Sequence, residues 1–305
     1  FAVTMFLKKA QISYADEGAG VHWPVTWFHW FVLLAAVPLG VPAIQTAMFV
    51  GFHPFSNGVD GIPDLWARRN GGAPTGIGLL SVGNEKVVWG VKPDGGVYQS
   101  LDQGGTWEPR AVGYTTVSAA ADGTVIGCNG YLGVVARWNE ETSQFDPIPA
   151  QLGAEHGLIL GVSAASSESL WCVTNTSNVL RSTDGGLNWK PTNGALHVVS
   201  AASDGSVDGV NRLQGILYRG VEASESWEPV ETPLGVAVYS TSVAAANEVW
   251  ILASQPAGYI YRSSGQGSTF ESVDGLLSDL SAAADGTVLG LNSSNIYELI
   301  EVAPS

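Results

Sequence analysis

The amino-acid sequence predicts an all-β protein: a six-bladed β-propeller over residues 66–305, closed by an N-terminal strand and preceded by an apolar, transmembrane helical segment. Three observations lead to this fold class. One string of residues recurs at a fixed distance, one aromatic residue accompanies each recurrence, and the 38 glycines suit tight turns between short strands better than a helical bundle.

The recurring string has the form Val-Ser-Ala-Ala-x-Asp-Gly-x-Val-x-Gly. Its three close copies are Val117–Gly127, Val199–Gly209 and Leu280–Gly290, about 82 residues apart. Three weaker copies lie halfway between them, at Ser81–Gly90, Val162–Trp171 and Ser242–Trp250. The unit is therefore about 41 residues long and occurs six times, with close and weaker copies alternating. A unit of this length matches one four-stranded propeller blade.

Each unit is completed by a short alternating strand, a turn and one aromatic residue. The six aromatic residues are Trp66, Trp107, Phe145, Trp189, Trp227 and Phe270. The last string has no aromatic strand after it, whereas Trp66 precedes the first string at the matching distance. We therefore expect residues 279–301 to form the last blade together with the strand near residues 65–68, which closes the ring and leaves no free sheet edge there.

Two of the turns match the pattern Ser-x-Asp-x-Gly-x-x-Trp at every fixed position, namely Ser100–Trp107 and Ser182–Trp189. In such a turn the carboxylates of Asp102 and Asp184 accept backbone N–H bonds, glycine adopts the left-handed conformation and tryptophan fills the space between sheets. The pattern resembles the Asp-box (BNR) repeat. We interpret both turns as structural.

The strings followed by Ile-Tyr-Arg resemble the tectonin repeat of lectin-type propellers over roughly residues 78–300. That resemblance implies carbohydrate binding in pockets between blades. No pocket residue is carried over, because the shared residues are those that build the blade.

Two other resemblances concern function. Asp boxes also occur in six-bladed sialidases, which need an arginine cluster with a tyrosine nucleophile and acidic partners. Here Arg137, Arg181, Arg219 and Arg262 recur at or next to one repeat position, which indicates blade architecture, and the Phe-Arg-Ile-Pro signature is missing. The Asp-box propeller that assists photosystem II assembly in the thylakoid lumen has seven blades and arginine-rich patches, so its binding site is not carried over. It does imply that such a propeller can serve a membrane complex.

The chain before the propeller divides into an N-terminal extension (1–24), an apolar segment (25–52) and a linker (53–65). No Asp, Glu, Lys or Arg occurs between Glu17 and Asp60. The apolar segment is long enough to span a bilayer and has aromatic residues towards both ends. Pro38 and Pro42 also fit an alternative, a buried apolar hairpin packed against the propeller.

His29 lies among the aromatic residues near one end of this segment. A neutral imidazole there is a candidate ligand for a metal or for the magnesium of a chlorophyll-type pigment, and lipid is the other ligand expected at the segment. The alternative is a hydrogen bond from His29 to headgroups, water or a partner's backbone. No metal-site motif occurs elsewhere, and we interpret the Asp-Gly pairs at Asp122, Asp204 and Asp285 as hairpin turns rather than calcium ligands.

The net charge of the sequence excludes nucleic acid as an expected partner, and the positions of the two cysteines predict that they are unpaired. The formal net charge is −15, so the basic surface of a nucleic-acid binder is not expected. Cys128 and Cys172 lie one repeat position apart on neighbouring blades, so we expect their side chains to point to opposite strand faces and not to form a disulfide.

Together these patterns predict a non-catalytic, membrane-anchored scaffold or docking subunit of a larger membrane protein complex, photosynthetic or respiratory. Its propeller is expected on the lumenal or extracytoplasmic side, with the other subunits and the lipid bilayer as partners. A tectonin-like lectin that binds glycans is the alternative, and a sialidase-like glycosidase is a remote one.

Overall fold

The computed structural model describes residues 65–69, 74, 76–149, 156–221, 225–265, 267, 269–292 and 295–300. The chain divides into residues 1–54 and 55–305, and every described residue belongs to the second unit. The predicted transmembrane segment, its hairpin alternative and the pigment ligand His29 therefore lie outside the described residues. Among the described residues, no helix has the length and apolar character needed to cross a membrane.

The described residues form 24 strands in six four-stranded antiparallel sheets. Blade 1 consists of β2 (Leu79–Val82), β3 (Val88–Val91), β4 (Val97–Ser100) and β5 (Glu108–Ala111). Blade 2 consists of β6 (Thr116–Ala119), β7 (Val125–Asn129), β8 (Val134–Asn139) and β9 (Gln144–Pro147). Blade 3 consists of β10 (Ile159–Ala164), β11 (Leu170–Thr174), β12 (Asn178–Ser182) and β13 (Lys190–Ala195).

Blades 4 to 6 repeat this arrangement. Blade 4 consists of β14 (Val198–Ala201), β15 (Val207–Asn211), β16 (Ile216–Val221) and β17 (Ser226–Pro229). Blade 5 consists of β18 (Ala237–Ala245), β19 (Glu248–Gln255), β20 (Ala257–Ser263) and β21 (Glu271–Leu276). Blade 6 consists of β22 (Asp279–Ala282), β23 (Val288–Asn292), β24 (Asn295–Leu299) and β1 (Trp66–Arg68). The predicted all-β, six-bladed propeller is confirmed.

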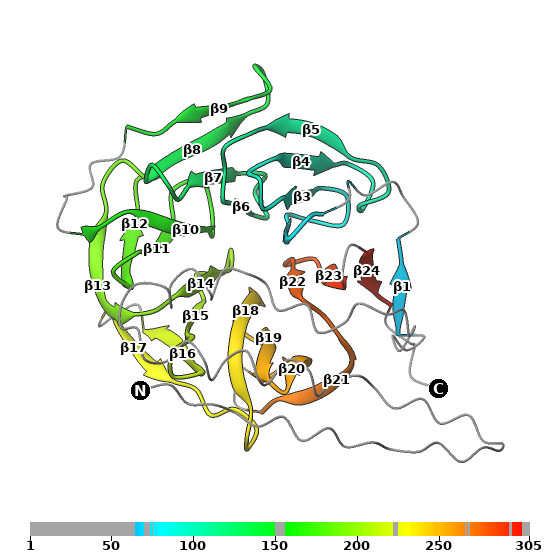
Figure 1. The fold of residues 1–305 in the computed structure, drawn as a ribbon. Helices are drawn as coiled ribbons and strands as arrows, with labels where there is room; N and C mark the ends of the chain where they lie inside the picture. Colours follow the sequence, from blue (N-terminus) through cyan, green and yellow to red (C-terminus); the bar gives the residue numbers. More distant parts are fainter. Residues whose placement is uncertain are drawn as a thin grey trace, which may run out of the picture. The chain divides into compact units, whose positions relative to one another are not determined.

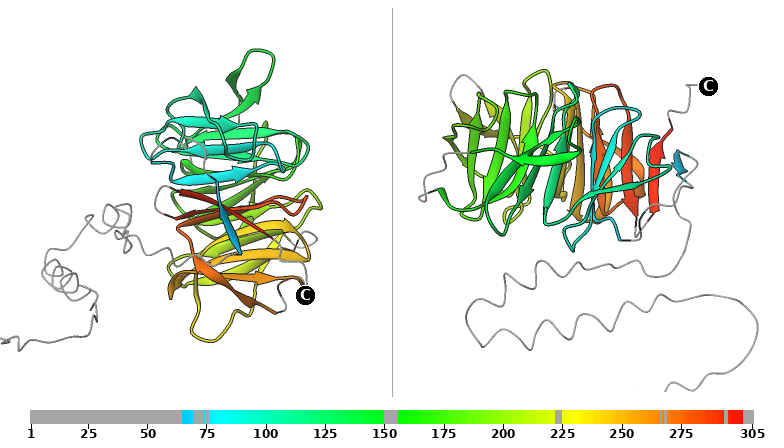
Figure 2. Two further views of the ribbon diagram at one scale, coloured as in Figure 1. Left: turned by 90° about the vertical axis from the view of Figure 1, so that its right-hand side faces the viewer. Right: turned by 90° about the horizontal axis from the view of Figure 1, so that it is seen from above.

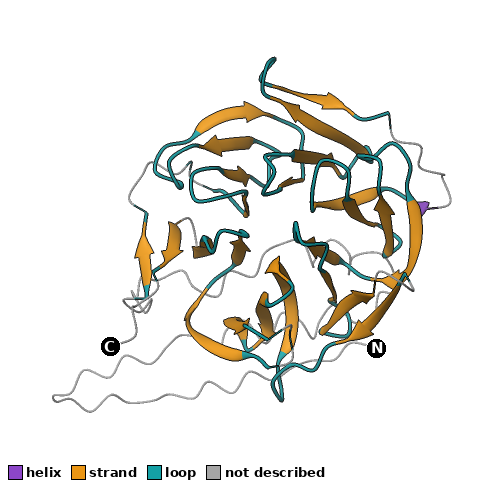
Figure 3. Ribbon diagram, turned by 180° about the vertical axis from the view of Figure 1, so that it is seen from behind, coloured by secondary structure: helices purple, strands orange, loops and turns teal. Residues whose placement is uncertain are grey.

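The six sheets stand around a common axis, with the first strand of each blade innermost (Figure 1). Seen from the edge, the strands cross the thickness of the ring, and loops join them at its two faces (Figure 2). Figure 3 shows the sheets from behind, with the strands in orange and the loops that join them in teal. We call the face where the innermost strands begin the upper face; it also carries the turns between second and third strands. The lower face carries the turns between first and second strands and between third and fourth strands.

Apolar packing occurs between blades rather than in one central core. The second strand of every blade is buried on both faces, as expected for a strand sandwiched between neighbouring sheets. The buried side chains form six hydrophobic clusters, one in each interface between successive blades. Each blade is therefore stabilised mainly by its two neighbours, as in other repeat architectures.

The N-terminal strand β1 supplies the fourth strand of blade 6. Trp66 is paired with Leu299 and Arg68 with Tyr297, and the N–H of Ile300 donates to the carbonyl of Leu65 at 2.8 Å. The ring is thus closed by hydrogen bonds between the two ends of the propeller, and the chain enters it at the lower face.

A ring of serine hydroxyls explains the serine of the recurring string. The innermost strands turn alternate N–H groups towards the axis, where no further strand accepts them. In each interface one serine hydroxyl accepts such an N–H from the next blade, at 2.8–3.0 Å. The six serines are Ser81, Ser118, Ser163, Ser200, Ser242 and Ser281.

The Asp-Gly turns add a second bond at every other interface. Asp122, Asp204 and Asp285 each accept an N–H within their own hairpin turn and, through Oδ2, an N–H of the next blade at 2.6–2.7 Å. These bonds join blade 2 to 3, blade 4 to 5 and blade 6 to 1. This alternation gives a physical reason for a repeat of two blades rather than one.

Cys128 and Cys172 are both free and buried, and both belong to the cluster between blades 2 and 3. Burial raises the pKa of the Cys128 thiol to about 12, and burial followed by the neighbouring Cys128 raises that of Cys172 further still. The two thiols are free, and their opposite strand faces do not place them in different clusters. Neighbouring blades pack face to face. A residue on one face of blade 2 and a residue on the opposite face of blade 3 therefore lie in the same interface.

Candidate functional site

The turns Ser100–Trp107 and Ser182–Trp189 are held by the same set of bonds. Asp102 accepts hydrogen bonds from the Ser100 hydroxyl at 2.8 Å, from the Thr106 N–H at 2.7 Å and from the Thr106 hydroxyl at 2.8 Å. Asp184 accepts the equivalent bonds from the Ser182 hydroxyl and from the N–H and side-chain amide of Asn188, at 2.7–2.9 Å. All the groups that donate to these two carboxylates belong to the turn itself, so neither carboxylate is arranged for catalysis.

Asp184 gives the turn a measurable pH dependence. Hydrogen bonds from the Asn188 side chain, the Asn188 N–H and Ser182, in that order, lower its pKa from 3.8 to about 2. Because the folded pKa lies below the unfolded one, the stabilisation is complete above pH 3.8 and is lost as the pH falls through about 2. We expect Asp184→Asn to unfold at lower urea concentration than the wild type at pH 7, and the gap to narrow as the pH falls through this window.

Urea midpoints measured across this pH range check the expectation. Glu141→Gln, which replaces an exposed carboxylate in a different lower-face turn, is the matched control and should leave the midpoint at pH 7 unchanged. A gap between Asp184→Asn and the wild type that stays constant down to pH 2 would contradict it.

The six predicted aromatic residues lie between blades rather than in one site. The Nε1 atoms of Trp107 and Trp189 donate to carbonyls of their own turns at 3.0 and 2.9 Å, and that of Trp66 donates to the carbonyl of Asp274 in blade 5 at 2.8 Å. Phe145 packs against Trp89 and Trp138. Trp227 and Phe270 border the clusters on the two sides of blade 4.

The four periodic arginines make separate contacts within the ring and do not form a carboxylate-binding cluster. Arg137 donates to the carbonyls of Ser167 and Gly185, while the guanidinium groups of Arg181 and Arg262 lie over the rings of Trp171 and Trp250. Arg219 forms a bidentate ion pair with the fully buried Asp208, at 2.9 and 3.1 Å. These contacts do not provide the arginine cluster with which a sialidase binds the carboxylate of its substrate. Among the described residues, no group of three or more His, Cys, Asp or Glu is placed to hold a metal ion.

The upper face carries most of the exposed apolar side chains. Of the 14 large apolar side chains that are exposed among the described residues, 11 belong to its loops and strand ends. They are Leu79, Val112, Tyr131, Leu132, Val134, Leu158, Leu160, Leu213, Leu234, Tyr239 and Tyr259. The other three, Leu101, Leu187 and Ile300, lie at the lower face. Exposed apolar side chains on one face are candidates for contact with another molecule.

The lower face has the opposite character. Its turns expose ten carboxylates among the described residues: Glu85, Asp102, Asp122, Glu140, Glu141, Glu168, Asp184, Asp204, Glu225 and Asp285. Much of the excess negative charge of the sequence therefore lies on the lower face. The upper face has fewer of the charges that oppose apolar contact.

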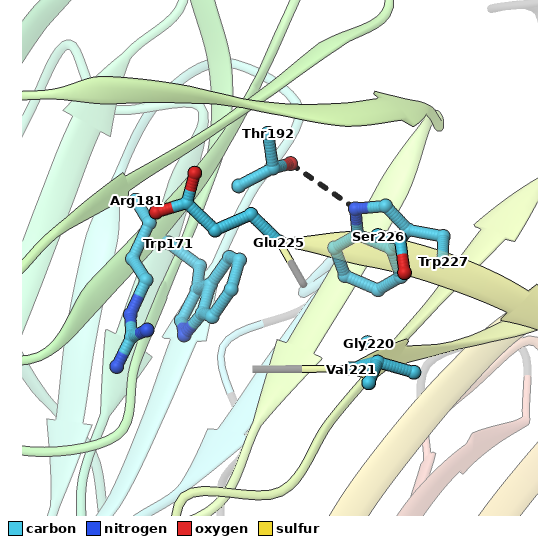
Figure 4. A pocket seen from close by; sticks show the side chains of 8 residues that line it. All are labelled: Trp171, Arg181, Thr192, Gly220, Val221, Glu225, Ser226 and Trp227. Carbon is cyan, nitrogen blue, oxygen red and sulfur yellow. Dashed lines mark hydrogen bonds between the residues drawn. The ribbon is translucent and has the colours of Figure 1, made fainter. Parts of the chain in front are cut away.

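A small hollow lies between blades 3 and 4 (Figure 4). It is lined by Trp171, Arg181, Thr192, Gly220, Val221, Glu225, Ser226 and Trp227, and Trp227 Nε1 donates to the Thr192 hydroxyl at 3.1 Å. Its empty space, about 220 Å³ with the solvent at its open side included, is small. Two tryptophan rings line the hollow, and its exposed surface is mostly apolar.

Sequence reasoning missed the upper face because its exposed residues do not recur. They lie in loops of unequal length, and only the ring brings them to one side. A run such as Tyr131-Leu132 between two predicted strands was the one local signal, since turns are usually polar.

Comparison with known proteins agrees with this architecture. The family model of the Tectonin domain matches residues 73–242 and again residues 157–303. Among solved structures, YCF48 from Cyanidioschyzon merolae is 16% identical, with 77% of this chain and 98% of that chain covered and a TM-score of 0.52. A structure of YCF48 bound to D1 peptide is 15% identical, with 78% and 99% covered and a TM-score of 0.54.

A third solved structure belongs to an enzyme. Virginiamycin B lyase from Staphylococcus aureus is 12% identical, with 76% of this chain and 98% of that chain covered and a TM-score of 0.52. At these identities the structural similarities show the fold alone. No curated protein matches the sequence.

Proposed function

This chain belongs to the tectonin-domain family, and from that premise we propose that it is a non-catalytic, membrane-anchored docking subunit whose upper face binds an apolar surface of a partner protein. The observation that carries the proposal is the concentration of 11 of the 14 exposed large apolar side chains on that face. A propeller of the same fold, YCF48, has been observed bound to D1 peptide, which supports a polypeptide as the kind of partner.

The anchor is the second part of the proposal. Residues 25–52 contain no Asp, Glu, Lys or Arg and have the length of a membrane span. Leu65, where the described chain begins, lies at the lower face. We place the propeller in a lumenal or extracytoplasmic compartment, within a photosynthetic or respiratory complex.

Paired substitutions test the docking face. We expect full-length protein purified from gently solubilised membranes to bring a partner with it, and Tyr131→Ser with Leu132→Ser to reduce recovery of that partner at least tenfold. Both side chains are well exposed, at 80% and 69%, so the fold should be unaffected. The matched control is Leu101→Ser with Leu187→Ser at the lower face, which should retain the partner. Equal losses in the two double variants, or no copurifying partner, would refute docking through the upper face.

The anchor is tested separately by an alkaline carbonate wash. The full-length chain should remain in the membrane pellet, and its release into the wash would show that residues 25–52 do not span the bilayer.

A tectonin-like lectin is the second candidate, favoured by the family and by the aromatic hollow beside Trp171 and Trp227. Selective binding of the full chain to a glycan array, lost in Trp227→Ala, would favour this function. A blank array would support the docking subunit.

A further inference from the structure

Two β-bulges turn side chains out of the blade packing at the upper end of the axis. In blade 3, Ile159 pairs with Thr174 and Gly161 with Val173, which leaves Leu160 as the extra residue of β10. In blade 5, Val238 pairs with Ala253 and Ser240 with Leu252, which leaves Tyr239 as the extra residue of β18. Both strands are innermost, and both extra side chains are exposed, at 40% and 43%. Bulges commonly re-aim a side chain next to a binding site.

Blade 4, which stands between these two blades, contributes a positioned arginine. Arg212 follows β15, and its Nε atom donates to the carbonyl of Tyr239 at 2.9 Å. Its guanidinium group also lies over the Tyr239 ring, 4.1 Å from the ring centre. The terminal nitrogens of Arg212 have no protein partner among the described residues. Stacking and one hydrogen bond therefore fix the group, while its paired donors remain available to a ligand.

Two titratable groups complete the arrangement. His197, one residue before β14, has a buried Nδ1 atom with no hydrogen-bond partner among the described residues. Burial, followed by the charge of Arg212, lowers the pKa of His197. Asp279 begins β22 in blade 6, and its Oδ2 atom accepts the N–H of Leu80 in blade 1 at 2.7 Å. In the other blades the residue equivalent to Asp279 carries no charge.

We propose that Leu160, His197, Arg212, Tyr239 and Asp279, which we call the axial site, bind the carboxylate of an apolar acid. The carboxylate accepts the two free donors of Arg212, and the apolar part lies on Leu160 and Tyr239. A cationic ligand is disfavoured because Arg212 is already there. The inference does not depend on the proposed docking role, since a small acid can bind with or without a partner protein.

Asp279 gives this site a pH dependence. Burial raises its pKa to about 7, against the smaller opposing effects of the N–H groups of Leu80 and Leu280 and of the charge of Arg212. Tyr239 of β18, His197 and Arg212 are the other titratable groups of the axial site. Below pH 7 the Asp279 carboxyl is neutral and no longer repels an anion, so affinity for a carboxylate should rise as the pH falls through this value.

Octanoate is a suitable probe, with octanamide as its uncharged match, in calorimetric titrations of the full-length chain at pH 6 and pH 8. We expect saturable binding of octanoate, stronger at pH 6, and none of octanamide. Arg212→Gln should weaken octanoate binding at least tenfold, because a bidentate charged pair is lost. Arg110 also lies over a ring, that of Trp138, so Arg110→Gln is the matched control and should leave octanoate binding unchanged. Asp279→Asn should remove the pH dependence.

Two sources share this chemistry, a free acid and the carboxyl terminus of a polypeptide. Competition with the peptide Ala-Leu-Leu, as its free acid and as its amide, separates them. Displacement of octanoate by the free-acid peptide alone assigns the site to chain termini, and no displacement assigns it to free acids. Octanoate that fails to bind at pH 6, or that binds equally to Arg212→Gln, overturns the axial site.

Discussion

Replacing Trp66 by alanine is expected to lower the free energy of unfolding by roughly 3–5 kcal/mol, the cost of deleting a large buried aromatic side chain. Trp66 is only 5% exposed and belongs to the cluster between blades 5 and 6. Its Nε1 atom donates to the carbonyl of Asp274, and Gly275 has a φ of +132° and would place a Cβ 3.0 Å from that nitrogen. The side chain therefore links β1 to the preceding blade at the point where the ring closes.

The measurement is the urea dependence of unfolding for the wild type, Trp66→Ala and Trp66→Phe. Phenylalanine retains most of the buried ring but loses the bond to Asp274, so Trp66→Phe should lose about 1–2 kcal/mol. If Trp66→Ala unfolds within 1 kcal/mol of the wild type, closure by β1 contributes little and the ring is held by its other interfaces.

Replacing Gly209 by alanine is expected to cost about 2–3 kcal/mol, although only one methyl group is added. A Cβ at Gly209 would lie 2.4 Å from Leu196 Cδ1 and 2.8 Å from the backbone oxygen of Val198. The leucine side chain can move, but the oxygen belongs to a neighbouring strand of the same blade and cannot do so without distorting the sheet. The last glycine of the recurring string is therefore required for space rather than for backbone flexibility.

Gly161→Ala is the matched control because it also lies on a blade strand. Its Cβ would meet only Val173 Cγ2, at 3.4 Å, so the change should alter stability by a few tenths of a kcal/mol. Thermal or urea unfolding of the two variants gives the comparison. Equal stability of Gly209→Ala and Gly161→Ala would show that blade 4 accommodates the added methyl group without a loss of stability.

Much of the ring could be predicted because its determinants are local and repeated. The string containing Ser118 and Asp122 marks a hairpin, and its recurrence counts the blades without any knowledge of contacts. The charge-free run from residue 18 to 59 is equally local, and the prediction of a membrane span rests on it alone. It remains a prediction, as does His29 as a pigment ligand.

The contacts between blades could not be read from the repeat. The sequence shows that Ser118 and Asp122 recur, but not that their oxygens accept N–H groups from the next blade. For the same reason the sequence does not show that Cys128 and Cys172 share one cluster, because strand alternation says which face a residue occupies and not which neighbouring sheet that face meets.

By itself, then, the sequence determined the class of the protein: the number of blades, their alternation in pairs and the residues that build each turn, since all of these follow from short-range pattern. Only the tertiary structure decided which side chains gather at the proposed axial site. Leu160, Arg212 and Asp279 come from three different blades, and the bulge at Leu160 has no sequence signal of its own. Closing the ring brings these residues to one end of the axis, because every innermost strand begins at the same face.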